Sequence, residues 1–321
     1  MQRKVSLIVP VYNEAGAIEP FLGAVEAVTK TLDAELDIIF VDDGSRDATC
    51  EEIIAATKSH STPIQLLALS RNFGKEAAIT AGIDAAAGDA VIPIDVDLQH
   101  PPEIIPRFIE EWRRGAKVVY GKRLDRDAET WPKRMTSRVF YRVFNALSQS
   151  DIPPDAGDFR LMDHSVVAAL ANYRERTRFM KGLFSAVGFK TAPVAYEVPA
   201  RRAGSTKWNY WQLWNFALDG IFSFSTVPIR VWTYVGALIA GLSLIYALWI
   251  VATTLIFGLD VPGYASLITA ILFMGGIQLI SLGIIGEYIA RIFLETKQRP
   301  IYTIDPSRSV MNQKPAPGSR S

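Results

Sequence analysis

Two long stretches near the C-terminus contain no charged residue, and they restrict the fold more than any other feature. One runs from Val231 to Phe257 and the other from Tyr264 to Gly286, with only the segment GLDVPG between them. About 20 apolar residues suffice to cross a bilayer, and a buried helix of a soluble protein rarely reaches this length without a charge. The pattern therefore predicts a hairpin of two membrane-spanning helices within residues 231–290.

The charges that flank these stretches predict their orientation. Arg230 precedes the first stretch, Arg291, Lys297 and Arg299 follow the second, and the connecting turn carries only Asp260. By the positive-inside rule, both flanks lie in the cytoplasm. The N-terminus has no long apolar signal region, so we expect a multi-pass protein of the inner (plasma) membrane with both termini cytoplasmic. Residues 291–321 would form a cytoplasmic tail, disordered over 311–321.

The net charge and the cysteine content argue against two classes of protein, those that bind nucleic acid through an overall positive charge and those held together by disulfides. The formal net charge is +1, so no global field indicates a nucleic-acid partner. The single cysteine, Cys50, excludes an intramolecular disulfide framework and fits a reducing compartment.

Residues 1–125 alternate between buried strands and helices. This order predicts an α/β fold with a mostly parallel sheet covered by helices on both sides. Residues 126–230 are less regular, and their basic and aromatic segments 133–149 and 208–226 favour amphipathic helices in the headgroup plane beside the hairpin; packing on the sheet is the alternative. The expected strands are 4–12, 36–45, 64–70, 90–98 and 117–123, and the expected helices are 14–32, 47–59, 74–88 and 102–115.

Acidic side chains lie at or just after the ends of three of these strands, at the edge of the sheet where open α/β folds bind ligands. They are Glu14, the pair Asp42 and Asp43, and the pair Asp95 and Asp97. In an extended chain, residues i and i+2 point the same way, so Asp95 and Asp97 can converge on one cation. With Gln99 they offer only oxygen donors, which suit Mg²⁺ or Mn²⁺ carrying a phosphate.

Neighbouring segments add weaker signals. DDGS is either an ordinary turn or an acceptor for a base or ribose, Tyr12 offers a stacking surface, and Lys75 at a helix start favours an anion. His100 is expected to be a surface or loop residue and not a metal ligand.

Taken in order, PVYNE, DDGS, SRNFGKEAAITAG, DVDLQHPPE, GDFRLM and AGSTKWN, followed by two spans, resemble the family 2 glycosyltransferases of the GT-A fold. Within that family the chain is similar, over residues 4–304, to the polyprenyl-phosphate glycosyltransferases, which include dolichyl-phosphate mannose synthase. The resemblance implies transfer of a hexose, glucose from UDP-glucose in the first place, to undecaprenyl phosphate with inversion. GDP-mannose or a UDP-aminoarabinose type of donor remains an alternative.

The resemblance also implies roles for individual residues. Asp95, Asp97 and Gln99 would hold the metal, and Asp97, Asp158, Arg202 and Lys207 would be catalytic. The donor would be bound by Pro10, Tyr12, Glu14, Asp42, Asp43, Lys75, Asp95 and Val96.

The acceptor needs cations rather than a strong base, because a lipid phosphate is already anionic at neutral pH. We therefore expect Asp158 to position the metal or the acceptor. A simpler explanation for basic residues close to the hairpin is their attraction to anionic lipid. The candidates for the acceptor phosphate are Arg123, Arg134, Arg138, Arg201, Arg202, Ser205 and Lys207.

Two rival functions are weaker. A processive polysaccharide synthase would carry a Gln-x-x-Arg-Trp motif and more spans, and a non-catalytic scaffold or nucleotide-sugar sensor would not need Asp95, Asp97, Asp158 and Lys207. Glycines in both spans could mark helix contacts between subunits, so we expect a homo-oligomer, with a tetramer as one option. These glycines are Gly236, Gly241, Gly275, Gly276 and Gly283.

Overall fold

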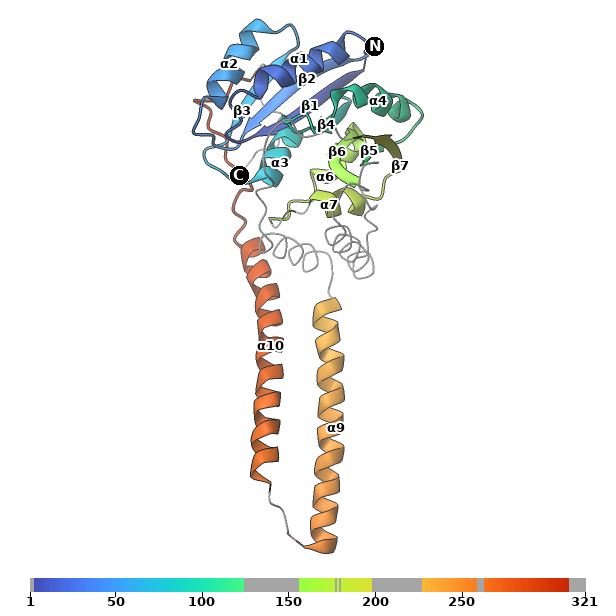
Figure 1. Cartoon of the computed structure of the whole chain (residues 1–321), viewed down its shortest axis with the longest axis vertical. Helices are drawn as coiled ribbons and strands as arrows, with labels where there is room; N and C mark the ends of the chain where they lie inside the picture. Colours follow the sequence, from blue (N-terminus) through green and yellow to red (C-terminus); the bar gives the residue numbers. More distant parts are fainter. Residues whose placement is uncertain are drawn as a thin grey trace.

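A computed structural model of the chain describes residues 3–123, 156–176, 178, 180–197, 227–258 and 263–311. The described residues form a sheet domain with helices on both faces, and a long pair of helices extends from it (Figure 1). Both parts match the expected architecture. Most of the less regular region 126–230, which was expected to bind the acceptor, lies outside the described residues, namely 126–155 and 198–226.

The sheet has seven strands in the order β3-β2-β1-β4-β6-β5-β7. The first four in this order are parallel, whereas β6 runs antiparallel to both β4 and β5, and β5 pairs with β7 in parallel. The mostly parallel sheet is therefore confirmed, with one inserted antiparallel strand. The strands are β1 (Lys4–Val11), β2 (Glu35–Asp42), β3 (Ile64–Ala68), β4 (Ala90–Pro93), β5 (Val118–Arg123), β6 (Ala156–Asp163) and β7 (Thr191–Tyr196).

Two hydrophobic clusters cover the two faces of the sheet. One contains α1 (Ile18–Thr29), α2 (Thr49–Ser59) and α4 (Ile105–Arg113), which follows the short 3₁₀ helix η1 (Pro102–Ile104). The other contains α3 (Lys75–Ala85), α6 (His164–Leu170) and α7 (Met180–Ala186). Strand β1 contributes side chains to both clusters, because alternate residues of a strand point to opposite faces of the sheet.

Helix α3 packs closely on β1, with Gly82 directly over the side chain of Ile8. A Cβ atom at Gly82 would lie 2.3 Å from Cγ2 of Ile8, so only glycine permits this approach. The close packing fixes the helix start, Lys75, beside the carboxyl end of the sheet.

The fourth strand is shorter than the sequence pattern predicted. It ends at Pro93, so the expected strand over 90–98 is wrong in its second half. Leu98 has φ of 58°, and the backbone N–H of Gln99 donates to Oδ1 of Asp97 at 3.1 Å. Asp97 therefore lies in a turn, and Asp95 lies between the end of β4 and this turn. The two-residue period of an extended strand does not apply to this pair.

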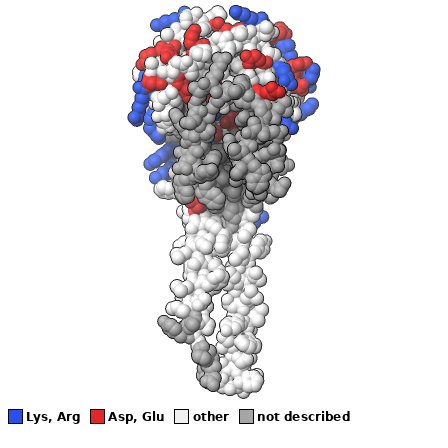
Figure 2. All heavy atoms as spheres, viewed as in Figure 1, with Lys and Arg blue, Asp and Glu red and all other residues white. Residues whose placement is uncertain are grey.

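The helical pair consists of α9 (Val227–Phe257) and α10 (Tyr264–Thr296). Both contain a span long and apolar enough to cross a membrane, Ile229–Phe257 and Ser266–Thr296, and neither span is buried by the rest of the chain. Figure 2 shows that charged side chains gather over the sheet domain and are nearly absent along the hairpin. Glu287 and Arg291 form an ion pair of 3.9 Å near the end of α10.

The five span glycines do not bring α9 and α10 together. A Cβ atom built at any of them would meet nothing within 4 Å. The proposed contact between subunits stays a prediction.

After α10 the chain returns to the sheet and pairs with its edge. Leu66 and Val310 exchange backbone hydrogen bonds of 2.9 Å, and Ser70 N–H donates to the carbonyl of Thr303 at 2.8 Å. Residues 302–310 thus cover the free edge of β3, which the sequence pattern did not predict. These hydrogen bonds connect the segment that follows α10 to the sheet domain (Figure 1).

Ending the chain at Arg299 should lower the unfolding midpoint of the full protein in detergent. The truncation removes the edge pairing of β3, and each lost hydrogen bond contributes about 1 kcal/mol. The matched control ends at Met311, the last described residue, and should unfold like the intact chain. Equal midpoints for the two truncations would show that residues 300–311 do not stabilise the sheet domain.

Candidate active site

The predicted acidic groups meet at one edge of the sheet. The parallel strands β1, β2 and β4 end there, and the antiparallel strand β6 begins there. In β4 and β6, Val91 pairs with Met162, and four residues further in that register stand Asp95 and Asp158. The inserted antiparallel strand therefore brings Asp158 to Asp95, although 62 residues separate them (158 minus 95, less one).

Lys75 joins these two carboxylates. Its Nζ lies 2.6 Å from Oδ1 and 2.7 Å from Oδ2 of Asp95, and 3.8 Å from Oδ2 of Asp158. Burial alone would lower the pKa of Lys75, but the two carboxylates outweigh it and raise this pKa above its ordinary value. Lys75 is therefore a fixed positive charge at the centre of the site.

His100 is a residue whose importance the sequence analysis missed. It lies in the loop, as expected, and only 16% of its side chain is exposed. Its ring stacks on Phe159 at 5.0 Å between centroids, and Nδ1 lies 3.7 Å from Oδ2 of Asp95. Burial lowers the pKa of His100, so the imidazole is neutral at pH 7. No periodic pattern could have revealed this contact.

The expected metal ligands lie on one loop. The carboxylate of Asp95 forms an ion pair with Lys75. The side chain of Asp97 is exposed, and that of Gln99 is half-buried. Among the residues that the structure describes, no group of three or more His, Cys, Asp or Glu side chains is arranged to hold a metal ion. Mg²⁺ ordinarily takes one or two protein carboxylates and completes its shell with water and substrate phosphates. The all-oxygen donor set on this loop fits an ion that arrives with a diphosphate.

Asp43 fixes the loop that leads into α3. Its Oδ1 accepts the N–H of Phe73 at 2.6 Å and its Oδ2 accepts the N–H of Gly74 at 2.9 Å. Burial raises the pKa of Asp43 despite these two hydrogen bonds. The carboxylate thus positions Lys75 through the residue before it.

Asp42 is fully buried, and its contacts are internal. It accepts from the N–H of Ser45 at 3.1 Å and from the thiol of Cys50 at 3.0 Å. Burial, together with Asp42, raises the pKa of the Cys50 thiol to about 12. Arg308 of the C-terminal segment lies 3.5 Å from the same carboxylate. A nucleoside contact by Asp42 stays a prediction.

The other expected donor-binding residues differ in accessibility. Tyr12 is 43% exposed and offers an open ring face. The backbone N–H of Glu14 donates to the hydroxyl of Thr49, and Pro10 is half-buried at the end of β1. Val96 is buried in the core, so only its backbone can face a ligand.

The expected acceptor cations fall mostly outside the described residues. For Arg123, the last residue of β5, the structure describes the backbone alone. Their roles stay predictions. The predicted residues outside the described ranges are Arg134, Arg138, Arg201, Arg202, Ser205 and Lys207.

Replacing Gly44 with alanine should impair this site. Gly44 has φ of 74°, and a Cβ atom there would lie 2.6 Å from the backbone carbon of Arg71, so the DDGS turn and the loop before α3 would separate. We expect a loss of turnover of at least about tenfold, because the loop that positions Lys75 would be displaced, and a tenfold loss corresponds to about 1.4 kcal/mol of transition-state stabilisation. Gly115→Ala is the control, because Gly115 has φ of 98° with open space around it. Equal effects of both substitutions would mean that backbone strain, and not the contact with Arg71, is responsible.

Two family profiles match the chain and together cover both of its parts. The profile described as glycosyl transferase family 2 matches residues 6–170. The profile described as the GtrB C-terminal hairpin matches residues 227–292, which include α9 and most of α10.

Full-length relatives are also similar. The chain is 51% identical to an uncharacterized glycosyltransferase of Synechocystis sp. over 95% of each chain. It is 50% identical to a prophage bactoprenol glucosyl transferase homolog of Escherichia coli and to the bactoprenol glucosyl transferase of Shigella phage SfX, over 94% of this chain and 98% of theirs. A glucosyl-3-phosphoglycerate synthase from Mycobacterium tuberculosis, solved with Mn²⁺ and UDP-glucose, is 18% identical with a TM-score of 0.43, over 68% of this chain and 77% of that one.

Proposed function

The chain belongs to glycosyl transferase family 2, and from this membership we propose that it transfers glucose from UDP-glucose to undecaprenyl phosphate with inversion. The observation that carries the proposal is the identity of about 50%, over nearly the whole length, to proteins named bactoprenol glucosyl transferases. The hairpin and the sheet edge with Asp95, Lys75 and Asp158 support it.

The metal would be held by Asp95 and Asp97, with Gln99 beside them. When bound, a divalent ion would neutralise the negative charge of the donor diphosphate. Lys75 holds the carboxylate of Asp95 in place through an ion pair of 2.6 Å and adds its own positive charge to this part of the site. Tyr12 offers its exposed ring for stacking against the base.

The acceptor phosphate would attack the sugar without a strong general base, because it is already anionic. His100 is neutral and packed against Phe159, so it holds the turn behind Asp95. Asp158 lies 3.8 Å from the ammonium of Lys75, and this contact supports a positioning role for its carboxylate.

The two apolar helices anchor the protein in a membrane, and we propose a cytoplasmic sheet domain with both termini on the same side. The described end of α10 leads directly into the segment that pairs with β3. This connection would keep the site near the headgroups, where a polyprenyl tail remains in lipid.

The test is a transfer assay with the purified full-length protein. It is incubated with undecaprenyl phosphate, Mg²⁺ and a panel of UDP- and GDP-sugars, and the lipid product is weighed by mass spectrometry. We expect undecaprenyl phosphate to gain one hexose from UDP-glucose. A product from GDP-mannose or a UDP-aminoarabinose donor alone would overturn the assignment of the sugar, and no product from any donor would overturn the enzyme itself.

A further inference from the structure

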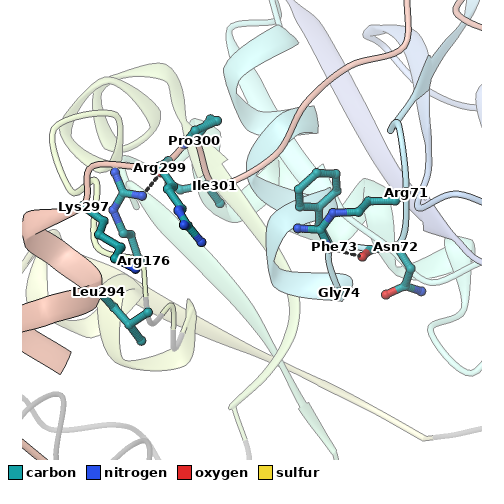
Figure 3. A pocket seen from close by; sticks show the side chains of 10 residues that line it. All are labelled: Arg71, Asn72, Phe73, Gly74, Arg176, Leu294, Lys297, Arg299, Pro300 and Ile301. Atoms are coloured by element: carbon teal, nitrogen blue, oxygen red, sulfur yellow. Dashed lines mark hydrogen bonds between the residues drawn. The ribbon is translucent and has the colours of Figure 1, made fainter. Parts of the chain in front are cut away.

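A pocket of about 440 Å³ lies where the hairpin meets the sheet domain. One side is the loop before α3, and the other is the end of α10 with the chain that follows it and Arg176 (Figure 3). The candidate span ends at Thr296, so the pocket opens at the border between membrane and water. Its lining residues are Arg71, Asn72, Phe73, Gly74, Arg176, Leu294, Lys297, Arg299, Pro300 and Ile301.

The lining contains four basic residues and no acidic one. Within the described part of the chain, no ion pair is found for any of the four. The guanidinium of Arg71 stacks on Phe73 at 4.0 Å, and the ammonium of Lys297 on Phe293 at 4.1 Å. Arg176 donates to the carbonyl of Arg299. These contacts orient the cations without neutralising them.

Two acidic side chains, Asp43 and Glu295, lie beside the lining, and both accept backbone N–H groups of lining residues. Asp43 accepts those of Phe73 and Gly74 at 2.6 and 2.9 Å, and the charge of Arg71 acts on it through space without an ion pair. Oε1 of Glu295 accepts the backbone N–H of Arg176 at 2.7 Å, and its contact is with the backbone and not with the guanidinium. Like charges gathered around one cavity repel each other, and an anion in the cavity relieves the repulsion. Leu294, Phe73 and Ile301 add apolar surface suited to the first carbons of a lipid chain.

We propose that this pocket binds the phosphate of a membrane lipid. Arginine forms bidentate contacts with phosphate, and lysine adds a point charge. The loop on one side is held by Asp43 and continues into Lys75, so the occupant lies next to the candidate active site. The phosphate could come from the polyprenyl phosphate acceptor or from an anionic phospholipid, and these two sources share the same chemistry.

The experiment is native mass spectrometry of the full-length protein in detergent, which counts bound lipids and requires no turnover. Four probes are added separately: undecaprenyl phosphate, phosphatidylglycerol, phosphatidylcholine and inorganic phosphate. The test variant is Lys297→Gln with Arg299→Gln, because neither side chain makes an ion pair in the described structure. Arg230→Gln is the control, since Arg230 is an exposed cation at the start of the other span.

We expect wild type to retain at least one of the two phosphate-bearing anionic lipids, and the double variant to bind it roughly thirtyfold more weakly, from two lost surface charges. Arg230→Gln should bind like wild type. Retention of undecaprenyl phosphate alone identifies the acceptor, and retention of phosphatidylglycerol identifies a phospholipid; either supports the proposal. Equal binding by the double variant, equal retention of phosphatidylcholine, or inorganic phosphate binding as tightly as lipid would overturn it.

Folding of the double variant is checked by its unfolding midpoint, and Lys297→Gln alone serves if the midpoint falls. The single variant should still weaken binding about fivefold. Because lipid retention is measured without a sugar donor, a failure here is distinguishable from a failure of glucose transfer.

Discussion

Replacing Asp95 with asparagine should reduce glucose transfer by about 100- to 1,000-fold with the fold intact. The carboxylate is the partner of Lys75 at 2.6 Å and a proposed ligand of the metal, and asparagine keeps its shape but removes its charge. Loss of one preorganised electrostatic group at a reacting centre typically costs this much.

Turnover and Mn²⁺ binding are both measured on the Asp95 variant. We expect Mn²⁺ affinity to fall together with turnover. Asp33→Asn is the matched control: Asp33 is 81% exposed, precedes β2 at the opposite edge of the sheet, and pairs with Arg113. If Asp95→Asn bound Mn²⁺ like wild type and lost activity only as much as Asp33→Asn does, Asp95 would not belong to the site.

Replacing Lys75 with glutamine should lower kcat by about 100-fold and at the same time tighten Mn²⁺ binding severalfold. The ammonium contributes positive charge to the site, so its removal weakens stabilisation of the leaving diphosphate. It also competes with the metal for both oxygens of Asp95, so its removal frees that carboxylate. General damage to the site would lower both kcat and the affinity for Mn²⁺. A lower kcat with a higher Mn²⁺ affinity therefore distinguishes the proposed role of Lys75 from such damage.

Lys75→Arg is the control for charge, since it keeps the cation on a longer and planar group. It should retain more activity than Lys75→Gln and should not bind Mn²⁺ more tightly than wild type. Weaker Mn²⁺ binding by Lys75→Gln would contradict competition between Lys75 and the metal for Asp95.

Much of the fold was predictable because it depends on local patterns. The uncharged stretches predicted α9 and α10, and the alternation of strands and helices predicted β1 to β5 with α1 to α4. The end of β4 was not predictable in this way, because Ile94 and Val96 continue an apolar pattern although Leu98 adopts φ of 58°. A run of buried residues does not reveal where a strand stops pairing.

Some residues of the candidate site could likewise be predicted from the sequence, and others could not. Asp42, Asp43 and Asp95 follow strands whose direction is fixed by the parallel order, so their common edge could be inferred. His100 could not, because its burial depends on Phe159 from β6. Arg308 lies 266 residues from Asp42 along the chain, and no spacing indicates their contact.

By itself, the sequence determined the elements, their order and the edge where acids gather, because hydrophobic period and turn residues act within a few positions. The tertiary structure decided which distant groups meet. Strand β6 pairs with β4, and this pairing brings Asp158 to Lys75. The chain after α10 pairs with the edge of β3, so Lys297 and Arg299 line the same pocket as Arg71. The reason is physical: strand register and the packing of distant segments are chosen by hydrogen bonding and burial over the whole domain, and no local pattern contains that choice.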